Sequence, residues 1–385
     1  MSRSSKGFLY FLCLLMVFNL LPIKASAEIS IASASAIIMD QKTGRVFYEK
    51  NAHTPRKIAS ITKIMTAILA IESGKMDEIV TISRQAVHTE GSSIYLIPGE
   101  KIKLEHLVYG LMLRSGNDAA VAIAEHVGGS LEGFVYLMNE KAAQLGMTNT
   151  HFANPHGLDD HEDHYSTAYD MAILTKYAME NETFRKISGT RVHHAPHPES
   201  RWDREWVNKH RLVNGMYKFT TGGKTGYTKL AKRTLVTTAS KNGMDLIAVT
   251  LNSPSARDWE EHIQMFEYVF ENYQYEKILK EGKIKAFKDP IYKNRAYLAR
   301  DFYYPVTQEE RDQFQIEFRL LRPKNSWKRH PEEIPEVIGK AEVYFNEELI
   351  ETLPVYYQHD PKPKKSFFEY LKDMFGAIIG VRGND

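Results

Sequence analysis

The stretch Ile58-Ala59-Ser60-Ile61-Thr62-Lys63 opens an apolar run that ends near Ser73. Nearly every residue from 64 to 71 is apolar, which predicts a helix buried on most sides rather than a surface helix with one apolar stripe. Residues three apart share a helix face, so the Lys63 amine can reach the Ser60 hydroxyl. The start of a helix also presents free backbone N–H groups, which favour negative charge that develops there. A hydroxyl nucleophile, an amine base and N–H donors are the parts of an acyl-transfer site.

The N-terminal segment predicts export. Arg3 and Lys6 precede an apolar run over residues 8–21, and Ala25-Ser26-Ala27 fits a small-residue cleavage site. A retained anchor fits less well, because the run is short and a cleavage site follows it. We therefore expect residues 1–27 to be a signal peptide and Glu28 to begin the mature protein.

Composition excludes several kinds of site. The single cysteine of the 385-residue chain, Cys13, lies in the predicted signal peptide, so the mature protein has no disulfide, no thiol nucleophile and no cysteine-ligated metal. The full chain has 50 basic and 48 acidic residues, and the signal peptide contains three of the basic ones. The near balance that remains gives no electrostatic case for nucleic-acid binding. We expect neither a cofactor nor a metal.

Residues 28–275 predict an α/β domain in which helices cover an antiparallel sheet. Two apolar runs, 35–40 and 45–50, flank a turn and form a hairpin, and Lys241-Asn242-Gly243 makes the turn between strands 233–240 and 244–251. A further short strand is expected over residues 78–83. Apolar periodicity predicts helices over residues 104–113, 119–127, 131–145, 167–180 and 260–273.

The last third of the chain has a different character. Short alternating stretches separated by proline and lysine predict a small β domain over residues 276–360. Pro361 and Pro363 mark a stiff linker within the segment 361–385. One helical stripe then follows, formed by Phe367, Leu371, Met374, Ile378 and Val381. Its charges make a membrane span unfavourable, so we expect a helix in the membrane interface, with docking on the β domain as the alternative.

Three motifs occur in a fixed order: Ser60-x-x-Lys63, Ser115-Gly116-Asn117 and Lys224-Thr225-Gly226. Ser-x-x-Lys alone is weak evidence, since an N-cap serine and a solvated lysine give it by chance. Two look-alikes, Lys42-Thr43-Gly44 and Ser240-Lys241-Asn242, fall in predicted hairpin turns that explain their residue types. The second motif instead interrupts two apolar helices, and the third follows two glycines that permit close backbone approach.

With these motifs the chain resembles the D-alanyl-D-alanine carboxypeptidases, the low-molecular-mass penicillin-binding proteins, and among them the sporulation-associated type of Bacillus. The match includes residues 58–67, 113–120, 154–158, 164–171 and 223–228. The resemblance implies the penicillin-binding-protein and β-lactamase-like transpeptidase fold. It also implies a peptidase acting on peptidoglycan stem peptides and acylated by β-lactam antibiotics. Such an enzyme would be attached to the outer face of the cytoplasmic or forespore membrane.

The resemblance also implies a role for each motif residue. Ser60 is the nucleophile, Lys63 is its base when held neutral near a cationic Lys224, and Ser115 and Asn117 relay protons and hold the substrate amide. Lys224 and Thr225 bind the terminal carboxylate, and Gly226 lets the substrate lie along the strand. The backbone N–H groups of Ser60 and Tyr227 form the oxyanion hole.

The histidines suggest no metal site from their spacing. His156, His161 and His164 lie in a stretch without regular ligand spacing, so we expect a solvated polar loop over residues 154–166. His193, His194 and His197 are expected in a surface loop for the same reason.

Three alternatives remain open. A β-lactamase would need a water-activating glutamate, and Asn154-Pro155-His156-Gly157 provides none. An endopeptidase that cuts cross-links shares the same motifs. A non-catalytic wall-binding protein would be favoured by the loss of Ser60, Lys63 or Lys224, all of which are present.

Overall fold

The computed structural model describes residues 29–360, which form two compact units. The first unit ends at Tyr273 and the second begins at Gln274, two residues before the boundary expected from the sequence. The predicted signal peptide and the segment 361–385 lie outside the described residues. Within residues 29–360, no helix is both long enough and apolar enough to cross a membrane.

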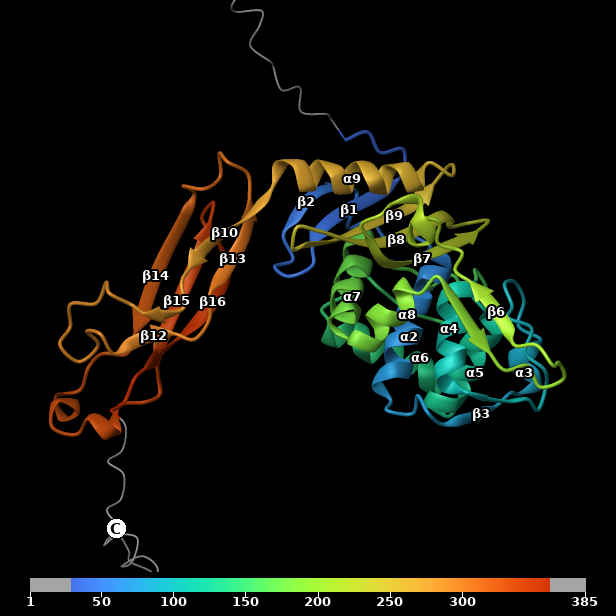
Figure 1. Cartoon of the computed structure of the whole chain (residues 1–385), viewed down its shortest axis with the longest axis horizontal. Coiled ribbons are helices and arrows are strands. Elements are labelled where there is room, and N and C mark those ends of the chain that lie inside the picture. Colours follow the sequence, from blue (N-terminus) through green and yellow to red (C-terminus); the bar gives the residue numbers. More distant parts are fainter. Residues whose placement is uncertain (1–28, 361–385) are drawn as a thin grey trace, which may run out of the picture. The chain divides into compact units, whose positions relative to one another are not determined.

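The first unit is built on one antiparallel five-stranded sheet with the strand order β2-β1-β9-β8-β7. Its strands are β1 (Ser35–Asp40), β2 (Val46–Lys50), β7 (Thr220–Thr228), β8 (Lys232–Lys241) and β9 (Met244–Ser253). Figure 1 shows α9 (Asp258–Asn272) on one face of the sheet and the other helices on the opposite face. Because both faces are covered, every residue of β1 is buried. The predicted hairpin 35–50, the β8–β9 pair and the helix near the end of the unit are confirmed.

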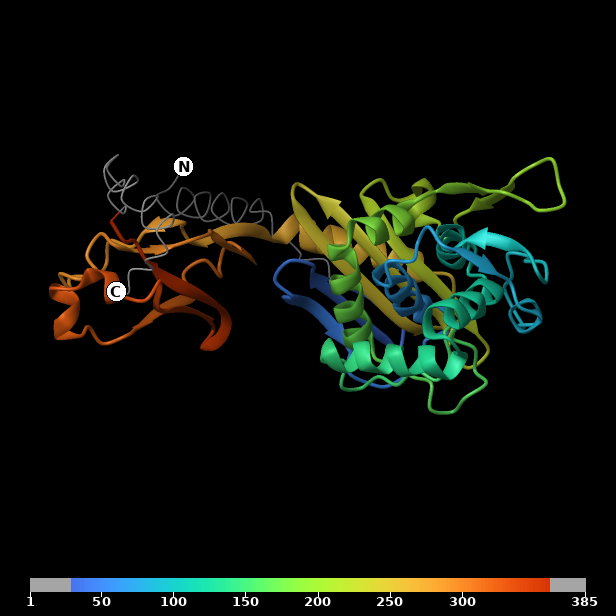
Figure 2. The same cartoon turned by 90° about the horizontal axis from the view of Figure 1, so that it is seen from below.

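The chain between β2 and β7 supplies the helical layer, which Figure 2 shows in front of the sheet. Its helices are α2 (Lys63–Glu72), α3 (Arg84–Val87), α4 (Leu104–Arg114), α5 (Asn117–Gly128), α6 (Leu131–Gln144), α7 (Ala168–Glu180) and α8 (Glu182–Gly189). Helix α2 lies at the centre, and all of its residues from Lys63 to Ile71 are buried, as its uniformly apolar sequence predicts. This central position fixes the first motif inside the helical layer.

Several short elements were not predicted. They are the pairs β3 (Ile79–Thr81) with β4 (Lys101–Lys103) and β5 (Val192–Ala195) with β6 (Arg204–Val207), helices α3 and α8, a 3₁₀ turn at Ala59–Thr62 and a π-helical turn at Leu212–Met216. Strand β3 is the exception, because a short strand was expected over residues 78–83. Most of these elements are too short to show an apolar period.

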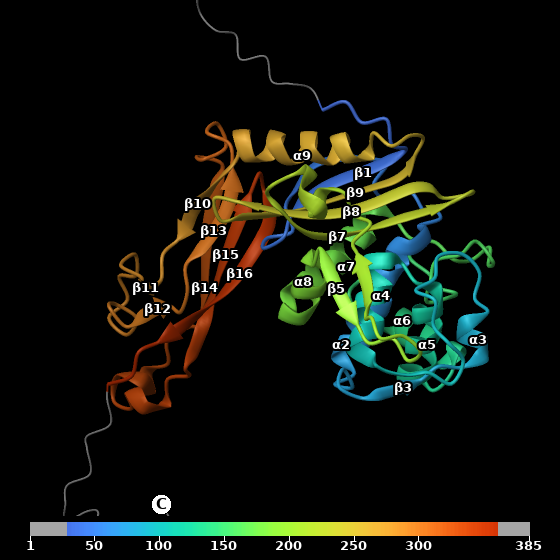
Figure 3. The same ribbon diagram turned by 45° about the vertical axis from the view of Figure 1, so that its right-hand side comes forward.

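The third motif lies inside strand β7, which was not among the strands predicted from the sequence. Strand β7 pairs with β8 along its length and forms the edge of the sheet, which Figure 3 shows. Its four threonines and three glycines carry no alternating apolar pattern, so the ladder with β8 determines its conformation. One backbone edge of β7 therefore faces the helical layer without a strand partner.

The second unit contains two antiparallel sheets. The larger has the order β11-β12-β16-β15-β14 and the smaller pairs β10 with β13. The strands are β10 (Gln274–Leu279), β11 (Gly282–Lys283), β12 (Ala296–Leu298), β13 (Phe302–Val306), β14 (Phe314–Leu320), β15 (Val337–Phe345) and β16 (Glu348–Tyr357). Side chains such as Tyr292, Trp327 and Leu353 form its separate core. The small β domain expected from the sequence is confirmed.

Candidate active site

The predicted nucleophile lies in the short 3₁₀ turn Ala59–Thr62, and α2 begins only at Lys63. Ala59 has a φ of +51°, a left-handed conformation that is uncommon for a residue with a side chain. Strain of this kind persists where surrounding structure holds it, and it is frequent at functional sites. Ser60 itself is only partly buried, so a substrate can reach its hydroxyl.

Lys63 is the most fully enclosed charged side chain near the turn, with no exposed surface. Its Nζ lies 2.9 Å from Ser60 Oγ, 2.7 Å from Asn117 Oδ1 and 2.6 Å from the carbonyl oxygen of His156. Burial, reinforced by the nearby Lys224, holds the pKa of Lys63 well below its ordinary value. Both effects favour the neutral, proton-accepting form of the amine.

The contacts of Lys63 account for every group of a neutral amine. Such an amine has two N–H donors and one lone pair, and both the Asn117 Oδ1 and the His156 carbonyl are acceptors only. These two oxygens take the two N–H groups. Nζ also lies 2.9 Å from Ser60 Oγ, so in the neutral form its lone pair can accept the hydroxyl proton of Ser60. The site thus holds a nucleophile beside an amine whose burial favours the proton-accepting form.

The second motif joins α4 to α5. Ser115 ends α4 in the left-handed conformation, with a φ of +65°, and the sharp bend brings Asn117 into the first turn of α5. Asn117 Nδ2 donates to the carbonyl of Glu90, which fixes the amide so that Oδ1 faces Lys63. Its backbone N–H donates to the carbonyl of Ser92 at 2.7 Å. The loop before β4 therefore helps to orient the second motif.

The third motif completes the cluster from the sheet. Lys224 on β7 is buried, and its Nζ donates to Ser115 Oγ at 3.0 Å and to the carbonyl of Thr225 at 2.8 Å. Burial, with a contribution from Lys209, lowers the pKa of Lys224 to about 7. Lys224 is therefore partly protonated at neutral pH, a smaller charge than the full cation expected from the sequence. Of the two buried lysines, Lys224 is the one that carries the proton.

Gly226 allows β7 to pass close to the nucleophile. A Cβ atom at this position would lie 2.8 Å from the backbone nitrogen of Ser60 and 2.4 Å from Thr234 Oγ1. Any side chain would push the strand away from the turn. Thr225 is half-buried beside this approach, and Tyr227, which follows it, is 66% exposed. All eight site residues predicted from the sequence thus lie on the 3₁₀ turn, the start of α2, the α4–α5 junction or β7.

The prediction of a solvated loop over residues 154–166 is wrong. Asn154, His156 and His164 are buried, because the loop packs against the back of the nucleophile turn. A Cβ at Gly157 would lie 1.9 Å from the carbonyl oxygen of Ala59. The loop also supplies the His156 carbonyl to Lys63. Its buried polar residues thus support the site, and only residues 160–163 of the loop are exposed as predicted.

His164 holds the strained turn through a chain of hydrogen bonds. Its Nδ1 accepts from the backbone N–H of Ala153, so its Nε2 carries the hydrogen and donates to Thr62 Oγ1 at 2.9 Å. Thr62 Oγ1 in turn donates to the carbonyl of Ala59 at 2.8 Å. Burial lowers the pKa of His164 to about 3, which keeps the ring neutral in this role. This support was not predicted from the sequence. The one sequence signal of burial is the apolar pair Phe152-Ala153, which directly precedes the loop.

The second histidine group also differs from its prediction. His193 lies in β5, is half-buried and stacks on Tyr109 with ring centroids 3.7 Å apart, so it is not a surface-loop residue. His194, also in β5, is exposed, and His197 is partly buried in the loop that follows β5. The first motif look-alike lies in the turn between β1 and β2, as predicted, whereas Ser240 and Lys241 of the second end strand β8 and only Asn242 lies in the β8–β9 turn.

Comparisons with known proteins agree with this geometry. The D-alanyl-D-alanine carboxypeptidase family matches residues 22–255, which include all three motifs, and the C-terminal domain of penicillin-binding protein 5 matches residues 273–362. D-alanyl-D-alanine carboxypeptidase DacF of Bacillus subtilis is 37% identical over 271 residues, covering 68% of this chain and 68% of the relative. DacA of Escherichia coli is 30% identical over 381 residues, covering 91% of this chain and 89% of the relative.

Solved structures share the architecture. Penicillin-binding protein 5 from Haemophilus influenzae superimposes with a TM-score of 0.70 at 27% identity, covering 86% of this chain and 98% of that chain. DacD from Francisella tularensis gives a TM-score of 0.66 at 26% identity, covering 88% of this chain and 95% of that chain. The fold, the motif order and the family match agree, and the chain belongs to the D-alanyl-D-alanine carboxypeptidases, serine peptidases of the penicillin-binding-protein type.

Proposed function

We propose that the protein removes the terminal D-alanine from peptidoglycan stem pentapeptides through an acyl-enzyme on Ser60. The observation that carries this proposal is the fully buried Lys63 amine, whose Nζ lies 2.9 Å from the Ser60 hydroxyl and whose pKa burial holds well below its ordinary value. Ser60 Oγ attacks the carbonyl carbon between the two D-alanines as its proton moves to Lys63. The proton then passes to the leaving amine of D-alanine by way of the Ser115 hydroxyl, while Asn117 Oδ1 holds Lys63 in place. Water releases the tetrapeptide and restores the serine.

The remaining motif residues bind the substrate in this proposal. The Lys224 ammonium and the Thr225 hydroxyl hold the terminal carboxylate, and the open edge of β7 at Gly226 pairs with the peptide as an added strand. The backbone N–H groups of Ser60 and Tyr227 stabilise the oxyanion, and their positions are supported by the close approach of Gly226 to Ser60. Each such donor contributes about 3 kcal/mol to transition-state stabilisation. A β-lactam ring presents the same carbonyl and carboxylate and acylates Ser60.

The proposal is tested by incubating the purified protein with a stem pentapeptide and with a cross-linked muropeptide dimer. Equimolar D-alanine and tetrapeptide are expected from the pentapeptide. Cleavage of the dimer alone, with no D-alanine from the pentapeptide, would make the protein an endopeptidase. No product from either substrate, together with no penicillin adduct, would favour the non-catalytic alternative.

Lys224→Ala is expected to separate the substrates by their charge. The variant removes the counter-charge of the terminal carboxylate, so kcat/KM should fall by about 10²-fold or more for a carboxylate-bearing peptide. A neutral ester should lose far less. Equal losses on the two substrates would contradict the assigned role. Lys42→Ala, in the look-alike Lys-Thr-Gly of the β1–β2 turn, is the matched control and should leave both rates unchanged.

The pH profile of the unaltered enzyme provides a second measure of the same role. The pKa of Lys224 is about 7, so its protonated fraction falls as the pH rises through 7. The kcat/KM for the carboxylate substrate should decline over that range, whereas the rate with the neutral ester should not. Lys63 acts in the same way on both substrates, so its titration would change both rates together and leave their ratio to report on Lys224.

We further propose that the mature protein acts on the outer face of the cytoplasmic or forespore membrane and is attached there by the segment 361–385. The support is the apolar stripe of that segment and the adjacent Lys362, Lys364 and Lys365. The resemblance to the sporulation-associated type supports a role in limiting cross-links of the spore cortex. Muropeptide analysis of cortex from a strain lacking the protein should show fewer stems that end in a single D-alanine.

Deletion of residues 361–385 is expected to release an active enzyme from membranes. The deletion leaves every described helix and strand intact, so D-alanine release and thermal stability should match those of the full-length protein. Fractionation of cells that express each form gives the measurement. If the shortened enzyme sediments with membranes after signal cleavage, or unfolds at a lower temperature, the segment docks on the β domain instead.

A further inference from the structure

The loop that orients the second motif carries an exposed aromatic residue in an unfavourable conformation. Tyr95 is 82% exposed and has a φ of +61°. A bulky side chain in this left-handed region is a genuine outlier, whereas asparagine or glycine occupies it at little cost. The described residues contain two other such outliers at the site itself, Ala59 and Ser115. Outliers of this kind gather where function requires a fixed geometry.

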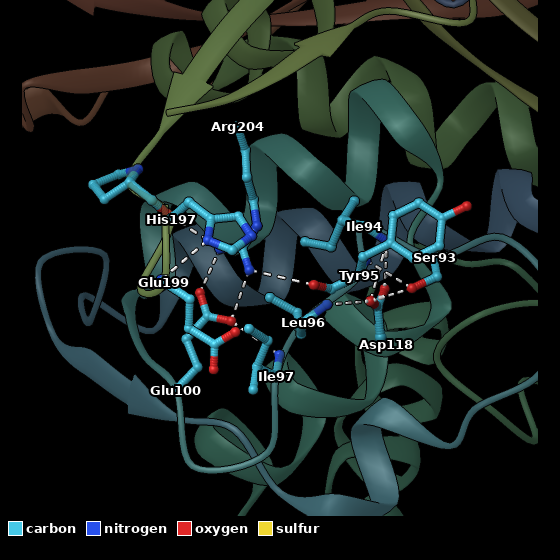
Figure 4. A network of polar contacts seen from close by, with 11 residues as sticks. Ser93, Ile94, Tyr95, Leu96, Ile97, Glu100, Asp118, His197, Glu199 and Arg204 are labelled. Carbon is cyan, nitrogen blue, oxygen red and sulfur yellow. Dashed lines mark hydrogen bonds and ion pairs between the residues drawn. The ribbon is translucent and has the colours of Figure 1, made fainter. Parts of the chain in front are cut away.

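A buried carboxylate holds the loop on the side facing the motif. Figure 4 shows Asp118, the residue after Asn117, receiving hydrogen bonds from the backbone N–H groups of Ile94 and Leu96 and from Ser93 Oγ. Asp118 is 1% exposed, so these bonds are shielded from water. The N–H of Tyr95 donates to Ser93 Oγ at 2.8 Å. The backbone N–H groups of Ile94, Tyr95 and Leu96 are therefore all hydrogen-bonded.

A buried ion pair holds the other side. Arg204 Nη2 donates to the carbonyl of Tyr95 at 3.3 Å. Its two terminal nitrogens, Nη1 and Nη2, also pair with the two carboxylate oxygens of Glu100. Arg204 is 8% exposed and Glu100 is 6% exposed. Figure 4 shows Arg204 and Asp118 on either side of the loop. Hydrogen bonds thus hold the Tyr95 backbone at both its N–H and its carbonyl.

The side chain of Ile94 packs the loop against the second motif. Ile94 fits against two glycines, because a Cβ at Gly110 would lie 2.6 Å from its side chain and a Cβ at Gly116 would lie 3.0 Å from it. Gly116 belongs to the second motif. Ile94 and Leu96 are 2% and 4% exposed, while Tyr95 between them points outward. The loop therefore presents one exposed ring on a fixed backbone, next to the second motif.

We propose that Tyr95 forms an outer subsite that contacts the stem peptide on the amino side of the cleaved bond. The inference rests on the proposed function, in which Asn117 holds the substrate amide and β7 pairs with the peptide from the opposite side. Asn117 is itself bonded to the loop through the carbonyls of Glu90 and Ser92, so a substrate amide held by Asn117 would place the amino side of the peptide next to this loop. A tyrosine has only two side-chain torsions to fix and the Tyr95 backbone is already held, so binding would gain contact area with little loss of conformational entropy.

The test compares substrates of different length. Tyr95→Ala should lower kcat/KM for a stem pentapeptide by about tenfold, chiefly through KM, which is the range for one lost aromatic contact. The same variant should leave turnover of a short N-acyl-D-Ala-D-Ala peptide and acylation by benzylpenicillin unchanged. Tyr95→Phe should keep the activity, because the ring makes the contact. Tyr136→Ala, which removes an exposed tyrosine from α6, is the matched control and should behave as the unaltered enzyme.

Tyr95→Asn separates binding from stability. Asparagine relieves the left-handed strain, so the thermal midpoint should not fall, yet the pentapeptide should lose the same activity as with alanine. Equal losses of activity on the pentapeptide, the short peptide and benzylpenicillin would mean that Tyr95 only supports the structure of the site. No loss on any of the three would show that Tyr95 forms no subsite. A loss confined to pentapeptide attached to its disaccharide would assign the ring to the glycan strand and overturn the proposal. If the unaltered enzyme releases no D-alanine from the stem pentapeptide, the proposed function fails instead.

Discussion

Ser60→Ala is expected to give a folded protein that neither releases D-alanine nor forms a covalent penicillin adduct. The side chain is partly exposed and makes one described hydrogen bond, to Lys63, so its loss should change the thermal midpoint little. The covalent route disappears completely because Ser60 is the serine that has a buried amine of lowered pKa within reach. D-alanine release and fluorescent-penicillin labelling measure the two losses.

Ser240→Ala is the matched control, because it removes the serine of the look-alike Ser-x-Asn at the end of β8. It should leave both activities unchanged. If Ser60→Ala still labels with penicillin, the adduct lies on another serine and the nucleophile is wrongly assigned. Peptide mapping of the labelled protein would then identify the residue that reacts.

Lys63→Ala is the second change expected to have a large effect. It removes the proton acceptor, so acylation by peptides, neutral esters and penicillin should all fall, by about 10²–10⁴-fold. The cavity that it leaves in the enclosed centre of the helical layer will also lower stability. Lys63→Met keeps most of the volume without the amine and separates the two effects. Its activity should be as low as that of the alanine variant, at a higher thermal midpoint.

Activity of Lys63→Met on neutral esters would contradict the role of general base. The contrast with Lys224→Ala is informative, because that variant should spare the same esters. A loss restricted to carboxylate substrates in both variants would mean that the two lysines together form only a binding site. The distances distinguish them, since Lys63 Nζ lies 2.9 Å from Ser60 Oγ whereas Lys224 Nζ lies 3.0 Å from Ser115 Oγ.

Elements with a strong apolar period could be predicted from the sequence. The uniform apolar run after Lys63 indicated a buried helix, and α2 is buried along nearly its whole length. The alternating runs of the first hairpin and of β8 and β9 were recognised for the same reason. The three motifs could be named because each places reactive side chains in an order that chance rarely gives.

The supporting parts of the site could not be predicted, because they act through the backbone or through distant pairing. The carbonyl of His156 accepts from Lys63, and a carbonyl has no sequence signature. Strand β7 is held by its ladder with β8 despite its glycines. The burial of His164 depends on contact with a turn about 100 residues earlier, which the polar sequence of its own loop conceals. Local pattern therefore predicted the reacting groups, and tertiary contacts supply the surroundings that lower the pKa of Lys63.

The most direct test of the central claim is a single-turnover experiment with the purified enzyme and a stem pentapeptide, stopped with acid and analysed by peptide mass spectrometry. The account predicts a tetrapeptidyl group on the peptide that contains Ser60, accompanied by one equivalent of D-alanine. Release of D-alanine with no covalent intermediate under conditions that trap the penicillin adduct, or a tetrapeptidyl group on a different serine, would contradict it.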